Sequence, residues 1–258
     1  MDLFFMQLFN ALSVSSILLL ASLGLAITFG LMGVINMAHG EFIMIGAYAT
    51  YVVQNIWKQI FPEAMFDWYF PAAILVSFLF TALLGVLLER VIICRLYGRA
   101  LDSLLVTWGI SLVLQQLVRS VFGPANVSVS CPSFLDKNIH IFGMFSMSCK
   151  RLFIFGLAVV CCALIGFLMY RTRQGRNIRA AMQNRPMAAS LGVNTAACDM
   201  MTFAVGSGFA GVAGCAITFL GSIGPTVGQS YIVDSFMTVV VGGVGRIVGC
   251  ITGSAVIG

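Results

Sequence analysis

Apolar stretches of membrane-spanning length recur along the sequence and limit the fold more than any other feature. They include Leu8 to about Gly33, Phe70–Leu88 and Leu152–Tyr170. A helix needs about 20 apolar residues to cross the hydrocarbon core of a bilayer. Backbone groups in that core must be hydrogen-bonded within their own segment, which restricts such stretches to helices. We therefore predict an all-α fold, a polytopic transmembrane helical bundle of about seven or more membrane segments, some of them broken or re-entrant.

Further candidate segments are Phe42–Ile56, Leu104 to about Val121, Met200–Ser222 and an apolar helix that starts at Ser235 after an outer turn at Gly221–Asp234. The composition supports a membrane protein, because 60% of the residues are hydrophobic and 9% are charged, whereas a soluble domain has about 25% charged residues. Met1–Asn10 holds no basic residue, so we expect a retained span rather than a signal peptide. Residues 1–258 are expected to form one membrane-spanning domain whose C-terminal part continues beyond Gly258.

Arginines cluster in two short connections, and this predicts the orientation of the chain. One is Glu89–Asp102, and the other, the basic loop, is Arg171–Asn194, with Arg171, Arg173, Arg176, Arg179 and Arg185. Basic connections beside a span stay on the cytoplasmic side because their charges resist translocation. The longer connection Arg119–Lys150 is then outside. It is predicted to hold a small hairpin, because apolar residues alternate at Val127, Val129, Ile139 and Ile141.

The basic loop is predicted to contain two short helices. Pro186 cannot continue a helix from Ile178–Asn184 but can open the next one, which Gly192 would end. Helical spacing is expected to place an apolar face on that second helix, formed by Met187, Ala188 and Leu191. Two interpretations stay open: a surface that docks a partner protein, or a solvated connection whose charges serve only to fix the topology.

A polar run interrupts the apolar character between the first two segments. It contains Asn36, His39 and Glu41, with no proper loop around them. It is either a tight turn at the membrane edge or a broken helix inside the membrane. Polar groups at membrane depth are costly unless they face a cavity or a partner, so they suggest a transport pathway, although a hydrogen-bonded interfacial turn is an equal alternative. We expect Glu41 to be buried and either paired or hydrogen-bonded.

The sequence contains no motif for catalysis or for nucleotide binding. It lacks GxxxxGK[ST], HExxH and a nucleophile elbow, so we expect neither an enzyme nor a cofactor, and any ATPase would be a separate chain.

The run Gly206–Gly211 matches a dinucleotide fingerprint, but no strand precedes it. Gly206, Ala210 and Gly214 are instead expected to form a face for close helix packing. The eight cysteines show no metal-binding spacing, and a disulfide between Cys131 and Cys149 is left open.

Three runs carry a resemblance to a known family: Gly33–Tyr48, Gly175–Asn194 and Leu220–Gly249. They resemble the permease family of branched-chain amino acid ABC importers, and the similarity extends over nearly the whole chain. The Gly228–Tyr231 run and the pair Gln115 and Gln116 resemble the urea-transporting branch of that family.

The resemblance implies partners and a place in the cell. The expected partners are a second homologous permease subunit, two ATP-binding subunits, a soluble substrate-binding protein and membrane lipid, with no nucleic acid. The expected location is the bacterial cytoplasmic (inner) membrane, with multiple passes. In related importers a loop with an alanine four residues before a glycine contacts the ATPase, which here corresponds to Ala188 and Gly192. The glutamate that often precedes this alanine is not evident.

The function expected from the sequence is therefore a permease subunit of an ABC importer, with urea as the solute. The alternatives are a permease for branched-chain amino acids, a facilitative urea or water channel, and a structural membrane protein. Residues expected near the substrate pathway are Asn36, His39, Glu41, Gln115, Gln116 and Gln229, although amides in spans also serve as contacts between helices. Residues expected to couple to the ATPase are Arg176, Arg179, Pro186, Met187, Ala188, Leu191 and Gly192.

Overall fold

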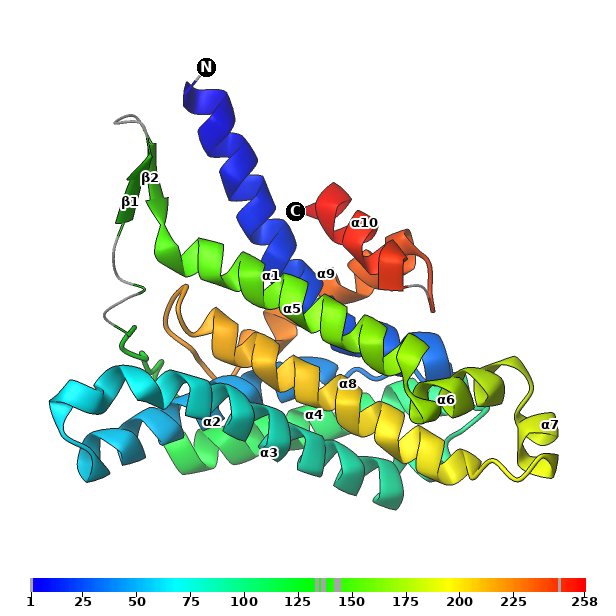
Figure 1. Ribbon diagram of the computed structural model, residues 1–258. Coiled ribbons are helices and arrows are strands. Elements are labelled where there is room, and N and C mark those ends of the chain that lie inside the picture. The colour runs from blue at the N-terminus through cyan, green and yellow to red at the C-terminus, as the bar shows by residue number, and fades with distance from the viewer. Residues whose placement is uncertain (1, 133–134, 136–137, 142–144, 246) are drawn as a thin grey trace.

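The computed structural model describes residues 2–132, 135, 138–141, 145–245 and 247–258, and these fold into a helical bundle (Figure 1). The α-helices are α1 (Asp2–Met32), α2 (His39–Ile60), α3 (Tyr69–Val91), α4 (Ala100–Phe122), α5 (Cys149–Arg171), α6 (Arg173–Gln183), α7 (Arg185–Ser190), α8 (Thr195–Ile217), α9 (Val227–Gly242) and α10 (Ile247–Ile257). Short 3₁₀ helices occupy Glu63–Trp68 and Ile93–Arg95, and a hairpin joins β1 (Asn138–Ile141) to β2 (Phe145–Ser148). The predicted helical bundle is confirmed.

Five segments of the described chain are long and apolar enough to cross a membrane. They are Gln7–Gly30, Phe66–Arg95, Leu101–Phe122, Cys149–Arg171 and Thr195–Ile217. Helices α2, α9 and α10 are further members of the bundle that fall outside this set. The bundle thus contains the predicted mixture of long spans and shorter segments, with the break between α1 and α2 where the polar run lies.

Helix α8 lies at the centre of the bundle, between α5 and α3 in Figure 1. Of its spanning window 78% is buried, compared with 22% for the window in α3. Small residues allow this, because a Cβ on Gly206 would lie 2.6 Å from the Thr28 side chain and 2.8 Å from the Gly24 carbonyl oxygen of α1. On another side of α8 a Cβ on Gly211 would overlap Thr81 of α3. The predicted close-packing face is confirmed, and it extends around the helix.

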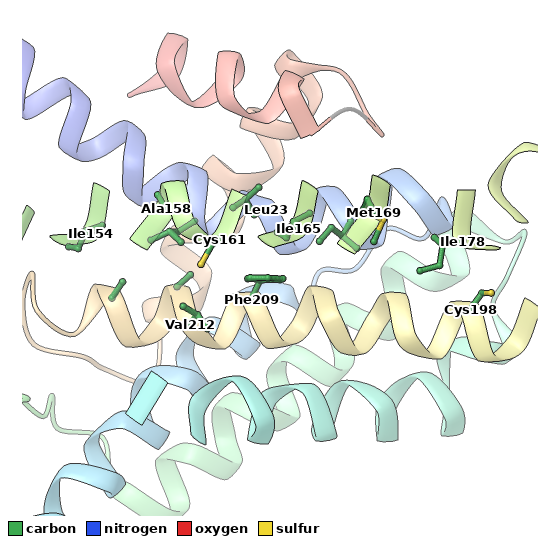
Figure 2. Close-up of a cluster of buried hydrophobic side chains, with 14 residues drawn as sticks. Leu23, Ile154, Ala158, Cys161, Ile165, Met169, Ile178, Cys198, Phe209 and Val212 are labelled. Carbon is green, nitrogen blue, oxygen red and sulfur yellow. The ribbon is translucent and has the colours of Figure 1, made fainter. Parts of the chain in front are cut away.

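Helix α5 covers α8 and α1 through a regular apolar stripe (Figure 2). Its buried residues recur every three or four positions, at Ile154, Ala158, Cys161, Ile165 and Met169. This spacing places them on one helical face, which packs against Phe209 and Val212 of α8 and Leu23 of α1. The opposite face of α5 exposes large apolar residues such as Val160 and Phe167, as expected of a helix that faces lipid.

The structure corrects two sequence predictions about the outer connections. Helix α9 begins at Val227, so the predicted outer turn Gly221–Asp234 is largely helical. Its polar residues lie on the exposed side of α9, while Gly228 sits against the backbone of Gly40.

The predicted hairpin exists, but Ile139 pairs with Met147 rather than with the earlier apolar positions. Those earlier positions contribute only an isolated bridge, from Val127 to Ile223. The structure joins Cys149 to no other cysteine among the described residues, so it contains no disulfide between Cys149 and Cys131.

The packing of α8 gives a direct test. Gly211→Leu should lower the thermal stability of the detergent-solubilised protein sharply, because the new side chain would enter the space of Ser77 and Thr81. Overpacking typically costs about 1–3 kcal/mol, and here backbone atoms cannot yield. The matched control is Gly109→Leu on α4, where no atom lies within 4 Å of the added Cβ. Equal melting temperatures for the two variants would contradict the packing described here.

Candidate functional site

The polar run forms a buried link between two helices. Helix α1 ends at Met32 and α2 begins at His39. The side chain of Asn36 closes this link, because its Oδ1 accepts a hydrogen bond from the Ala38 backbone N–H at 3.1 Å. Asn36 is 1% exposed, so the link lies inside the bundle. The polar run thus separates two helices, and its depth in the membrane stays a prediction.

Glu41 lies in the first turn of α2 and is 1% exposed. Its Oε1 accepts hydrogen bonds from Ser111 Oγ at 2.9 Å and from Gln115 Nε2 at 2.7 Å, both on α4. The expectation that Glu41 is buried and hydrogen-bonded is therefore confirmed. A buried carboxyl group without such donors would be costly, so these two bonds hold the start of α2 against α4.

The buried face of α4 is a polar stripe. Its residues recur every four positions at Ser103, Thr107, Ser111 and Gln115, each 5% exposed or less. Thr107 Oγ1 accepts a hydrogen bond from the Met37 backbone N–H at 3.0 Å, so α4 also contacts the link before α2. We call Asn36, Glu41, Thr107, Ser111 and Gln115 the polar seam. The outer face of α4 is apolar and exposed, for example at Leu105, Val113 and Leu117.

Two polar atoms of the seam have no partner within the described part of the chain. They are Glu41 Oε2 and Asn36 Nδ2, and both are buried. One is a hydrogen-bond acceptor and the other is a donor. Buried polar groups are normally hydrogen-bonded, so the seam retains an unused acceptor and an unused donor. Such groups suit a small polar ligand that offers both a cationic or N–H group and an acceptor oxygen.

The other predicted pathway residues lie elsewhere. His39 is fully buried on the opposite side of α2, where its Nε2–H donates to the Ala21 carbonyl oxygen of α1 at 3.0 Å. Gln116 is exposed on α4, one position after Gln115, so its side chain points away from the seam. Gln229 is exposed near the start of α9. The structure thus joins Glu41 to Gln115 and buries Asn36 in the link just before α2, but it places the other three predicted residues elsewhere.

The basic loop folds as the sequence predicts, into α6 and α7. The side chain of Asn184 caps α7 by accepting from the Met187 N–H at 3.1 Å, and Pro186 stands in its first turn. Gly192 ends this segment with φ +82°, a conformation that side chains other than glycine rarely adopt. Met187 and Leu191 are 61% and 76% exposed. These two residues form an exposed apolar face at one end of the bundle, as the position of α7 in Figure 1 shows.

The structure corrects the prediction for Ala188. Ala188 is 3% exposed, whereas Met187 and Leu191 are exposed. Helical spacing alone would place Ala188 beside Leu191, three residues on, so its burial comes from the way the loop folds around it. The Ala188 carbonyl also accepts from the Val193 N–H at 3.0 Å. Ala188 therefore supports the fold of the loop from within rather than forming its surface.

A charged cluster ties the basic loop to the rest of the bundle. Arg185, at the start of α7, forms a salt bridge with Asp199 on α8. Its guanidinium also lies over the Tyr97 ring, 4.8 Å from the centroid. Tyr97 OH donates to Glu89 Oε1 at 3.1 Å. Burial, with Asp199 and Glu89 nearby, raises the pKa of Tyr97 well above its ordinary value. The two basic connections thus lie at the same end of the bundle, as predicted.

Comparison with known proteins assigns the chain to a family. The sequence profile described as "Branched-chain amino acid transport system / permease component" matches residues 7–258. This chain belongs to the branched-chain amino acid permease family. It is therefore a permease component of a transport system.

Named relatives cover nearly all of this permease. It is 29% identical to the high-affinity branched-chain amino acid transport system permease protein BraD of Pseudomonas aeruginosa, over 98% of this chain and 83% of that protein. It is 30% identical to LivH of Escherichia coli strain K12, over 99% and 84%. It is 26% identical to a probable LivH of Methanocaldococcus jannaschii, over 98% and 78%. No solved structure matches the chain significantly.

Sequence reasoning missed three residues of the α4 stripe in this permease: Ser103, Thr107 and Ser111. Their four-residue spacing was visible, since one hydroxyl per turn on the same face of an apolar helix is an ordered pattern. The sequence alone could not show that this row of hydroxyl groups lies opposite Glu41, so the row could not be interpreted. The expectation of urea as the solute gains no support from these relatives, whose names specify branched-chain amino acids.

Gln115 and Gln116 are neighbours on α4 but differ in burial, so they allow a matched test of the polar seam. Gln115→Leu should destabilise the permease and reduce transport, because it removes a donor from a buried carboxyl group. An unsatisfied buried polar group costs about 1–3 kcal/mol. Gln116→Leu makes the same chemical change at an exposed position and should leave both properties intact. Thermal melting and vesicle uptake measure them, and equal effects of the two changes would exclude a specific role for Gln115.

Two arginines of the basic loop, Arg185 and Arg176, should differ in how much they contribute to stability, because Arg185 belongs to the charged cluster. Arg185→Gln should lower the melting temperature of the permease, because Asp199 is 8% exposed and would lose its cationic partner. Arg176→Gln should change it little, since Arg176 is exposed and single exposed charges contribute little to stability. A melting temperature unchanged by Arg185→Gln would show that the salt bridge does not hold α7 to α8.

Proposed function

We propose that this permease forms the translocation pathway of an ABC importer for branched-chain amino acids in a bacterial cytoplasmic membrane. Membership of the family carries this proposal, and the named relatives support the solute. ATP hydrolysis would take place on two separate ATP-binding subunits. A second homologous permease and a soluble substrate-binding protein would complete the assembly.

The pathway would open along the polar seam. An amino acid is a zwitterion, so its ammonium group needs an acceptor and its carboxylate needs a donor. Glu41 Oε2 and Asn36 Nδ2 are the buried acceptor and donor that the seam leaves unused. The apolar side chain of Ile45, one helical turn after Glu41 on the same face of α2, would contact an aliphatic substituent. These features support the proposal because they match both ends of the solute.

Urea is the second candidate solute. The run Gly228–Tyr231 and the pair Gln115–Gln116 favoured it in the sequence. In the structure the side chains of Gln229 and Gln116 are exposed outside the seam, which leaves Gln115 as the only one of these amides that meets Glu41. A ligand binding a protein stabilises it in proportion to its affinity and concentration. The cognate binding protein should therefore melt higher with leucine than with urea, and the reverse result would make urea the solute.

We further propose that Met187 and Leu191 form the surface that contacts the ATPase, with Arg176 as a further contact and with Pro186 and Gly192 fixing the shape of the loop. The exposure of these two apolar residues supports this, because a solvated connection has no need of them. Ala188, which is buried, would act through the fold of the loop.

Leu191→Glu tests the coupling surface. It should leave the permease folded, since Leu191 is 76% exposed, but should weaken binding of the ATPase tenfold or more by placing a carboxylate in an apolar contact, a loss of at least about 1.4 kcal/mol. Substrate-stimulated ATP hydrolysis in reconstituted vesicles measures it, with pull-down of the ATPase. Ala180→Glu, also exposed but on α6, is the matched control. Normal stimulation in the Leu191→Glu protein would mean that the loop is a solvated connection only.

A further inference from the structure

A cavity of about 300 Å³ lies between α1, α5 and α6. Its volume is at the lower end of the range for ligand pockets, about 300–1,000 Å³. The described residues that line it are Ala26, Ile27, Met169, Tyr170, Arg179, Met182, Gln183 and Gly245. The lining is mostly apolar. Because Tyr170 and Met182 are exposed, the cavity reaches the surface.

The cavity lies at the membrane edge. Ala26 and Ile27 stand near the end of the spanning segment Gln7–Gly30, and Tyr170 near the end of Cys149–Arg171. Helix α6 begins two residues after α5 ends, and Gly175 packs so closely on the backbone of Met169 that a Cβ there would overlap it. The amphipathic helix α6 therefore lies against the ends of two spans, where lipid headgroups meet the protein.

Arg179 is the one charged residue among those described in the lining. Its guanidinium lies over the Tyr170 ring, 4.9 Å from the centroid. The salt bridges and hydrogen bonds of the described residues give this guanidinium no carboxylate, whereas Arg185 and Arg99 each have one. The stacking orients the guanidinium plane and leaves its N–H donors unused at the mouth of an apolar cavity.

Further positive charge surrounds the mouth. Arg171, Arg173 and Arg176 are exposed around the start of α6, and no acidic residue occurs between Arg171 and Asn194. A free phosphate would be drawn to these charges but would gain nothing from the apolar interior. A phospholipid offers both a phosphate and an acyl chain, and basic pockets between the ends of spanning helices bind anionic headgroups.

We propose that this cavity binds an anionic phospholipid, with its phosphate on Arg179 and part of an acyl chain between α1 and α5. A guanidinium presents two parallel N–H groups to a phosphate, and the Tyr170 ring holds Arg179 in place for this. The bound lipid would fix α6 against α5. Arg179 and Arg176 then differ in role, since Arg179 faces the cavity while Arg176 does not line it. The proposal does not depend on the transported solute.

The test is a binding titration of fluorescent phosphatidylglycerol on the full-length permease in detergent. Arg179→Gln should weaken binding tenfold or more. Arg95→Gln removes the same charge at an exposed position away from the cavity and should change binding less than twofold. Gln183→Trp, which leaves the charge unchanged, should also weaken binding by filling the mouth of the cavity.

Competition experiments distinguish the sources of phosphate. Unlabelled phosphatidylglycerol should displace the probe, whereas phosphatidylcholine and soluble glycerol phosphate at equal concentration should not. Equal losses in Arg179→Gln and Arg95→Gln would show attraction to net charge and overturn the proposal. Full displacement by glycerol phosphate would also overturn it, because the acyl chain would then contribute nothing. Thermal melting of each variant, measured without lipid, confirms that it is folded.

Discussion

The close approach of helix backbones around α8 is the constraint on which the rest of the structure depends. In a membrane, association between helices relies on van der Waals contact, so small residues at the contacts matter more than apolar area. A Cβ on Gly214 would overlap the Ile43 carbonyl of α2, and Gly206 and Gly211 make comparable approaches to α1 and α3. These contacts fix α2, and with it Glu41, which lies two residues before Ile43.

The contact that α2 makes with α8 differs in type from the contact that it makes with α4. Towards α8 the contact is dry and tight, with no room for an added methyl group at Gly46. Towards α4 it combines hydrogen bonds around Glu41 and Thr107 with contacts of Tyr48 and Tyr51 on the Phe122 ring, and most of the surface of α4 is exposed. Such a contact can separate at lower cost than the glycine contacts. In the pathway proposed here, the contact of α2 with α8 would stay fixed while its contact with α4 separates.

Features that depend on local sequence were predictable. The existence of the long helices, a helix with Pro186 in its first turn and the end of that segment at Gly192 follow from apolar length, proline and glycine, and the structure has them. The bounds of the long helices were less accurate, since α8 is Thr195–Ile217 where Met200–Ser222 was predicted. Features that depend on contact with another helix could not be predicted from the sequence. The serine and threonine stripe of α4 has meaning only opposite Glu41, and the early start of α9 depends on Gly228 meeting Gly40. The burial of Ala188 also depends on how the loop folds, because helical spacing alone places it beside the exposed Leu191.

The central claim is that the polar seam between α2 and α4 opens to water during transport, and cysteine labelling tests it most directly. In a cysteine-reduced background, Ser111→Cys places a thiol in the seam, and Ser77→Cys places one at an equally buried position on α3, facing α2. A water-soluble maleimide should label position 111 faster when the assembled transporter turns over ATP with a loaded binding protein, and should leave position 77 unlabelled. Labelling of position 111 that stays as slow as that of position 77 under turnover would contradict the account.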